Sequence, residues 1–187
     1  IEEPISLGTI VPTDQVCALA GRKVKAVLTG EGADEIFAGY RKFMIEMAAQ
    51  EFEMLSAKRQ QQLLSRFPEL KGYLGRRHAD PEQRYIQPEA LFSTDELGRL
   101  IGSTGKDIEF SEQARPALSG REHPVNAAIA YETRFRLPDY VVLRLDKLSM
   151  RHSLETRTPL LDYRLAEFAA RLPLPLKVNL ALDREKL

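Results

Sequence analysis

The sequence predicts an α/β fold in which helices far outnumber strands. Most of the chain shows apolar residues at the three- and four-residue spacing of amphipathic helices, which gives six or seven helical segments. Only residues 24–28 (V-K-A-V-L) have the length and β-branched content of a strand. That strand passes into a loop rich in glycine and acid at residues 29–34, and a helical pattern follows. The order strand, loop, helix is the building unit of α/β proteins.

Glycine and proline divide the helical segments from one another. Thr13 and Asp14 are suited to cap a first helix that Gly21 ends. Pro138 is expected to break a helix, after which Asp139 caps the next. The expected helices cover residues 13–20, 36–55, 57–67, 125–137, 139–149 and 162–172, with one more after a capping-box sequence at 93–96. The expected loops are residues 71–88 and 102–124.

A single strand is physically incomplete. Its backbone N–H and C=O groups need a neighbouring strand, so either other strands escape the pattern or the rest of the sheet lies outside this sequence. We favour the second explanation. The chain is then the later, mostly helical part of a larger α/β domain.

Composition narrows the possible functions. The chain has 187 residues, of which 43% are hydrophobic and 29% charged, as in one globular domain. Lys plus Arg equals Asp plus Glu at 27 each, which argues against nucleic acid or a membrane surface as partner. No apolar run approaches the ~20 residues that span a bilayer. Cys17, the single cysteine, excludes an internal disulfide and fits a cytoplasmic location.

The loop between the strand and the helix has the features of a phosphate site. Free N–H groups at a helix start attract anions, and Gly30 and Gly32 allow close approach and positive φ. Glu31, Asp34 and neighbouring Glu35 supply carboxylates, which beside phosphate usually imply Mg²⁺. The same carboxylates could instead only stabilise the helix N-terminus. The residues alone leave both readings open.

Two sequence blocks resemble the asparagine synthetase family. Residues 24–40 (V-K-A-V-L-T-G-E-G-A-D-E-I-F-A-G-Y) resemble its V-K-V-V-L-S/T-G-E-G-A/G/S-D-E-L/V-F-G-G-Y pattern, with Ala38 as a mild change inside the expected helix. Residues 146–162 resemble D-R/K-x-S-M…L-E-x-R-x-P-F-L-D, with Leu160 in place of Phe. Residues 2–4 and 12–13 are similar to D-E-P…P-T. Together these blocks span nearly the whole chain.

The resemblance implies an enzyme that forms an acyl-adenylate from ATP and a carboxylate, which a nitrogen nucleophile then attacks. It implies nucleotide contacts by Thr29, Gly30 and Gly32, a Mg²⁺ ligand in Asp34, and an active-site acid in Glu31 that orients or deprotonates the amine. Lys186, the family's lysine in this segment, would meet pyrophosphate and the developing oxyanion. The implied substrates are ATP, aspartate and ammonia from glutamine. The implied fold is an adenine-nucleotide α-hydrolase-like ATP pyrophosphatase (PP-loop) domain.

Parts of the family pattern have no counterpart in residues 1–187. The pyrophosphate loop S-G-G-x-D-S and the N-terminal glutaminase domain with its nucleophilic cysteine are both missing, and Cys17 is expected to be a core residue. We therefore expect 1–187 to be a partial synthetase domain, inactive alone. Its expected partners are a glutaminase domain of the same polypeptide and a second copy of the protein in a homo-oligomer.

Three alternatives remain at this point. The chain could belong to a related amidotransferase, or to a β-lactam synthetase or peptide cyclase that uses an internal amine; Glu31 favours the asparagine-synthetase type. It could also be a non-catalytic remnant or scaffold.

Glu155, Arg157 and Asp162 are expected to form a structural ion network. Glu132 has no assigned role.

Overall fold

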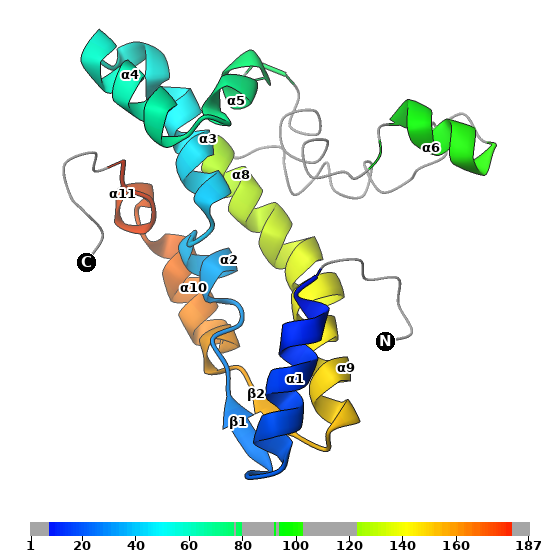
Figure 1. Ribbon diagram of the computed structural model, residues 1–187. Helices are drawn as coiled ribbons and strands as arrows, with labels where there is room; N and C mark the ends of the chain where they lie inside the picture. The colour runs from blue at the N-terminus through cyan, green and yellow to red at the C-terminus, as the bar shows by residue number, and fades with distance from the viewer. Residues whose placement is uncertain (1–7, 77, 80–91, 93, 103–122, 181–187) are drawn as a thin grey trace. The chain divides into compact units, whose positions relative to one another are not determined.

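Figure 1 shows the computed structural model of the chain, which describes residues 8–76, 78–79, 92, 94–102 and 123–180. These residues are mostly helical and include two short strands. They divide into two compact units. The first unit draws on Ile1–Gly39 and Glu132–Pro173, and the second on Tyr40–Tyr131 and Leu174–Leu187. None of the described helices is long and apolar enough to cross a lipid bilayer.

The first unit contains a parallel pair of strands. β1 (Ala26–Leu28) pairs with β2 (Glu155–Arg157), with Ala26 opposite Glu155 and Leu28 opposite Arg157. Hydrogen bonds of 2.9 Å from Glu155 N to the Lys25 carbonyl and from Thr29 N to the Arg157 carbonyl extend the pairing at both ends. The alternative that a strand escapes the sequence pattern is therefore confirmed for β2. A three-residue polar strand has no apolar alternation by which the sequence could reveal it.

Two helices pack beside these strands. α1 (Ile10–Gly21) contacts α9 (Leu143–Arg151), and α9 contacts β2 (Figure 1). α1 starts before Thr13, so the predicted cap was wrong: Thr13 Oγ1 donates to the Thr9 carbonyl at 2.8 Å inside the first turn. Asp14 also lies within the helix. Its Oδ1 is 2.8 Å from His152 Nε2, which joins α1 to the end of α9.

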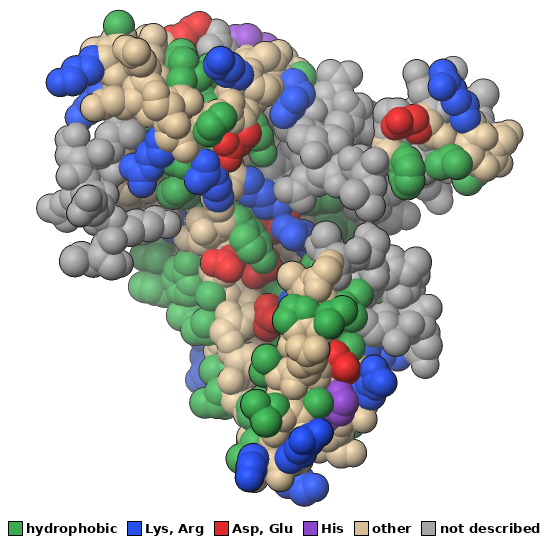
Figure 2. Space-filling model, viewed as in Figure 1, with side chains coloured by type: hydrophobic (Ala, Val, Ile, Leu, Met, Phe, Trp, Pro, Cys, Tyr) green, Lys and Arg blue, Asp and Glu red, His purple; other side chains and the backbone are tan. Residues whose placement is uncertain are grey.

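The outward face of α1 carries apolar side chains. Val11, Val16 and Leu19 are each more than 60% exposed. They give the hydrophobic surface over α1 in Figure 2, beside the Lys and Arg side chains that gather where α1 turns into β1. The buried side of the same helix presents Cys17, whose thiol pKa is raised by burial and then by the Asp14 carboxylate. The expectation that Cys17 is a core residue is confirmed.

The predicted helix over residues 36–55 is interrupted. The structure has α2 (Ala33–Phe37), α3 (Arg41–Glu51) and a 3₁₀ turn, η1 (Phe52–Met54). Ala38 ends α2 with φ of 58°, so the view that it is a mild change inside a helix was wrong. A left-handed conformation costs a non-glycine residue roughly 1–2 kcal/mol. Apolar spacing continues across the break, and spacing alone cannot reveal a reversed backbone handedness.

Pro138 does not break its helix. It lies inside η5 (Glu132–Val142), a π-helix that runs directly into α9. Proline cannot donate a hydrogen bond, and its ring collides with the carbonyl four residues earlier in an α-helix. The wider π turn, with its i to i+5 hydrogen bonds, accommodates this. Asp139 is consequently an interior residue of η5 and not the predicted cap.

The last helix of the first unit lies where the sequence predicts it. η6 (Pro159–Leu161) follows β2, and α10 (Tyr163–Arg171) confirms the helix predicted there. Asp162 caps α10 by accepting from Arg164 N at 2.9 Å, and its hydrogen bonds with Arg164 lower its pKa to about 2. The predicted ion network is confirmed for Arg157 and Glu155, which pair at 3.0 Å, and wrong for Asp162, which pairs with Arg164 instead. Glu155 and Arg157 are exposed because alternate residues of β2 face outward, and the pair of Asp162 and Arg164 is exposed at the start of α10.

The second unit has a helical core of its own. Its described helices are α3, α4 (Ala57–Arg66), α5 (Leu70–Arg76), α6 (Thr94–Ile101), α8 (Pro124–Tyr131) and α11 (Leu174–Lys177). α5 overturns the loop predicted from residue 71, because Leu70 is fully buried and anchors a helix despite two glycines. The loop predicted for 102–124 lies mainly outside the described residues. The core cluster consists of Ile45, Ala48, Ala49, Leu63, Phe67 and Leu70.

We predict that Leu63→Ala lowers the free energy of unfolding of the second unit by about 2–5 kcal/mol, because Leu63 is completely buried and its loss leaves a cavity. The neighbouring exposed residue supplies a control: Gln62→Ala should change stability by less than about 0.5 kcal/mol. Urea denaturation of both variants tests this. Equal effects would contradict the core described here.

Candidate functional site

The candidate site is the loop that leaves the carboxyl end of β1. Thr29 continues the strand through its N–H bond to Arg157, while its hydroxyl oxygen is buried and has no hydrogen-bond partner among the described residues. Buried polar atoms are almost always paired, so an orphan hydroxyl at a strand end is a position where a ligand atom fits. Thr29 and Glu31 both line a cavity of about 480 Å³. The rest of that cavity is mainly apolar, formed by α1, β1, Leu145 and Leu154.

The two glycines of the loop have different roles. Gly32 has φ of +93°, and a Cβ there would collide with the Leu161 side chain, so both conformation and space require glycine. Gly30 is exposed, lies outside the positive-φ region, and would present an added Cβ to open space. The prediction of positive φ is thus confirmed for Gly32 and wrong for Gly30. The backbone of Gly30 is the part of the loop open to an approaching ligand.

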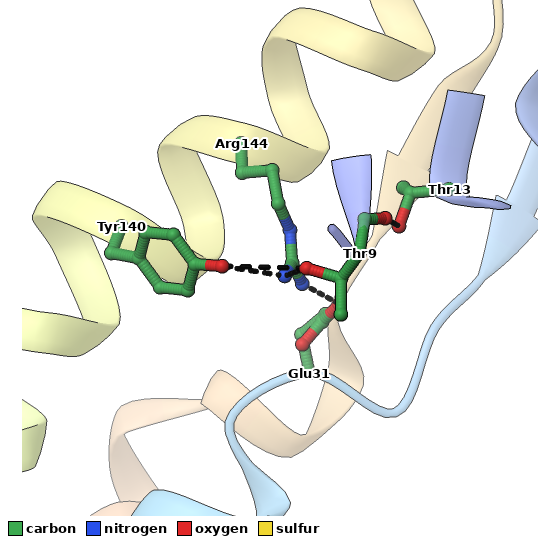
Figure 3. Close-up of polar contacts among 5 residues, drawn as sticks. All are labelled: Thr9, Thr13, Glu31, Tyr140 and Arg144. Atoms are coloured by element: carbon green, nitrogen blue, oxygen red, sulfur yellow. Dashed lines mark hydrogen bonds and ion pairs between the residues drawn. The ribbon is translucent and has the colours of Figure 1, made fainter. Parts of the chain in front are cut away.

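Glu31 is held by a buried arginine. Arg144 Nη2 donates to Glu31 Oε1 at 3.3 Å, and their side chains are 11% and 28% exposed. Arg144 Nη1 donates to Thr9 Oγ1 at 2.9 Å and to the Tyr140 hydroxyl at 3.3 Å (Figure 3). The loop, the start of α1 and the η5–α9 junction therefore meet at one guanidinium group. The glutamate lies at the mouth of the loop as an ordered carboxylate.

Asp34 lies in the first turn of α2 and is exposed. Its side chain folds back toward Gly39, where a Cβ would collide with Asp34 Oδ1. The carboxylate makes no hydrogen bond or ion pair with the described residues. No cluster of three or more potential metal ligands occurs in the described ranges. A single free carboxylate suits Mg²⁺, which commonly takes one or two carboxylates together with substrate phosphates and water.

The helix at this site is shorter than the sequence suggested. α2 has only five residues, so its dipole supports an anion less than the predicted long helix would. Lys186, the predicted cationic contact, lies outside the described residues. Glu132 is fully buried and its Oε2 accepts from Arg136 Nη1 at 3.2 Å.

Sequence reasoning missed Arg144, Tyr140 and Thr9. Tyr140 and Arg144 are four residues apart on one helical face, a spacing that is also common in ordinary helices. Thr9 precedes Arg144 by 135 residues, and no local pattern reports such a contact. Only the tertiary structure shows that Thr9, Tyr140 and Glu31 all contact Arg144.

Comparisons with known proteins identify the family of the chain. Residues 1–187 match the family model described as asparagine synthase. The chain is 30% identical over 187 residues to a protein of Mycobacterium tuberculosis named "Putative asparagine synthetase (glutamine-hydrolyzing)", covering 96% of this chain and 29% of that protein. It is 25% identical to asparagine synthetase (glutamine-hydrolyzing) 1 of Bacillus subtilis, covering 95% and 29%. It is 26% identical to amidase chyE of Penicillium rubens, covering 87% and 28%. No solved structure matches the chain significantly.

The parallel strand pair set among helices places the first unit in the α/β class. The chain belongs to the asparagine synthase family, whose domain has an adenine nucleotide α-hydrolase-like fold. It spans a little under a third of the length of the curated relatives that it matches.

We predict opposite effects of adding a methyl group at the two loop glycines. Gly32→Ala should destabilise the first unit by about 2–3 kcal/mol, from the strained φ and the collision with Leu161. Gly30→Ala should leave stability unchanged or raise it by up to about 1 kcal/mol, because neither problem exists there. Thermal unfolding of the two variants distinguishes these effects. A destabilised Gly30→Ala variant would contradict the loop geometry.

Proposed function

We propose that this chain forms part of a site that converts a carboxylate into an amide with ATP through an acyl-adenylate. The observation that carries the proposal is the ordered Glu31 carboxylate at the end of β1, fixed by Arg144 beside the open backbone of Gly30. Membership of the asparagine synthase family supports it across residues 1–187. The intact Glu31 and Asp34 argue against a non-catalytic remnant.

In the proposed reaction the substrate carboxylate oxygen attacks the α-phosphorus of ATP, and the bond to pyrophosphate breaks. Ammonia then attacks the acyl carbon, the C–O bond to AMP breaks, and the nitrogen loses one proton. Glu31 takes that proton or orients the amine, since an ionised carboxylate is an acceptor. The backbone at Thr29, Gly30 and Gly32 approaches the nucleotide phosphates, with Gly32 fixing the turn.

Asp34 is the proposed Mg²⁺ ligand. Its carboxylate is exposed and makes no hydrogen bond or ion pair within the part of the chain that the structure describes, which fits that role. Mg²⁺ bound there would neutralise charge on the phosphates. Lys186 remains the proposed cationic contact for pyrophosphate and the developing oxyanion, by the family resemblance.

The proposed carboxylate is aspartate and the proposed nitrogen source is glutamine, supplied through a glutaminase domain of the same polypeptide. The names of the bacterial relatives support this choice. The similarity to amidase chyE keeps a different amide product as the second candidate. Product analysis with aspartate and with other carboxylates separates them: asparagine formation supports the first candidate, and amide formation only from another carboxylate supports the second.

We predict that Asp34→Asn in the complete gene product abolishes ATP–pyrophosphate exchange. The exposed position should keep the change in stability within about 1 kcal/mol, so lost activity would not reflect misfolding. Glu167→Gln on exposed α10 serves as a charge-matched control that should retain exchange. Near-normal exchange by Asp34→Asn would show that Asp34 is only a helix-end charge.

We predict that Glu31→Gln impairs amide formation more than adenylation. Glutamine keeps the size and one acceptor but cannot take a proton at neutral pH, and loss of a general base typically lowers rate ~10²–10⁴-fold. Pyrophosphate and AMP release should continue while water replaces ammonia as the attacking group. Parallel assays of pyrophosphate and amide test this. Equal loss of both products would assign Glu31 to nucleotide or metal binding instead.

A further inference from the structure

Arg144 is an unusual residue in the first unit because its cation is nearly enclosed. Its side chain is 11% exposed. Arg144 lies in the first turn of α9, and its guanidinium group faces the loop (Figure 3). Its Nε is buried without a hydrogen-bond partner among the described residues. Burying an arginine with an unsatisfied N–H lowers the stability of the fold, so such a group in a native structure calls for an explanation.

Two neutral groups fix the direction of the guanidinium. The Tyr140 ring lies 5.2 Å from Arg144 Cζ, and its hydroxyl oxygen accepts from Nη1 at 3.3 Å. Thr9 Oγ1 accepts from the same nitrogen at 2.9 Å. Because Nη1 is occupied by neutral oxygens from two elements, Nη2 is turned toward the loop. A planar guanidinium can be held at one end and donate at the other, whereas the single ammonium of lysine cannot do both at this separation.

The only interaction of the Glu31 side chain with the described residues is its bond to Arg144 Nη2 through Oε1. A free glutamate side chain samples many rotamers, and ordering it in advance lowers the entropy lost when a reaction needs it in one place. Oε2 makes no hydrogen bond within the described ranges, so one oxygen is anchored and the other is available to a nitrogen nucleophile. This is the arrangement expected of a positioned proton acceptor.

We propose that Arg144, oriented by Tyr140 and Thr9, is a positioning residue that holds the Glu31 carboxylate for the amine-transfer step. The proposal rests on the proposed function, in which Glu31 acts on the incoming amine. Arg144 acts through Glu31, to which its Nη2 donates. Its removal therefore affects the transfer of the acyl group to ammonia and leaves adenylation intact.

The test is a double-mutant cycle in the complete gene product, read as the ratio of amide formed to pyrophosphate released. Arg144→Lys should lower that ratio about 10- to 100-fold, since a misplaced catalytic group loses rate to this extent. The KM for ATP and the rate of pyrophosphate release should stay within about twofold of the parent. In the Glu31→Gln background Arg144→Lys should have no further effect on the ratio, because residues that act as a unit are not additive.

Two further variants keep the test decisive. Tyr140→Phe removes only the hydroxyl and should lower the ratio about two- to tenfold, as expected for one hydrogen bond, even if Arg144→Lys does not fold. Arg151→Lys, on the exposed side of α9, is the matched control and should leave the ratio unchanged.

The outcomes separate the two proposals. Additive effects of Arg144→Lys and Glu31→Gln, or a fall in pyrophosphate release equal to the fall in amide for Arg144→Lys and Tyr140→Phe, would overturn the positioning role. If Glu31→Gln itself leaves the ratio unchanged, the proposed function of Glu31 fails instead.

Discussion

The pairing of β1 with β2 is the constraint on which the rest of the first unit depends. It joins Ala26–Leu28 to Glu155–Arg157, segments separated by more than half the chain, through a three-residue register. Because the strands are parallel, their carboxyl ends lie together, and the glycine-rich loop emerges beside the turn that contains Leu161. The same pairing also positions α9, because α9 contacts both β2 and α1. Without it neither the conformation of Gly32 nor the position of Arg144 would be defined.

A second constraint is the shortness of α2. This five-residue helix lies between two left-handed residues, Gly32 with φ of 93° and Ala38 with φ of 58°. Residues in such conformations persist where surrounding contacts determine them, and they are common near functional sites. Here the contacts are the Leu161 side chain below Gly32 and the Asp34 carboxylate against Gly39. Glu31 therefore lies in the loop before Gly32, and Asp34 lies in the first turn of the short helix after it.

Charge burial explains how the loop is connected to the helices. Arg144 is enclosed, and a buried cation needs a carboxylate and neutral acceptors to be tolerated. Glu31, Thr9 and Tyr140 supply these. In contrast, the pairs Glu155–Arg157 and Arg164–Asp162 are solvent-exposed, and such pairs contribute little to stability. The cluster around Arg144 therefore holds the candidate site together, whereas the two exposed pairs lie on the surface of the first unit.

The sequence by itself determined which elements form locally and which residues carry chemistry. Its short β-branched run located β1, its apolar spacing located α10, and its glycine–acid motif located the loop, because each of these signals is set by a few neighbouring residues. Tertiary structure alone decided that β2 is a strand, that Pro138 lies inside a π-helix, that Ala38 is left-handed and that Arg144 binds Glu31. The pairing of β2 and the contact of Arg144 depend on partners far away in the chain, and such contacts leave no periodic pattern in the residues that make them.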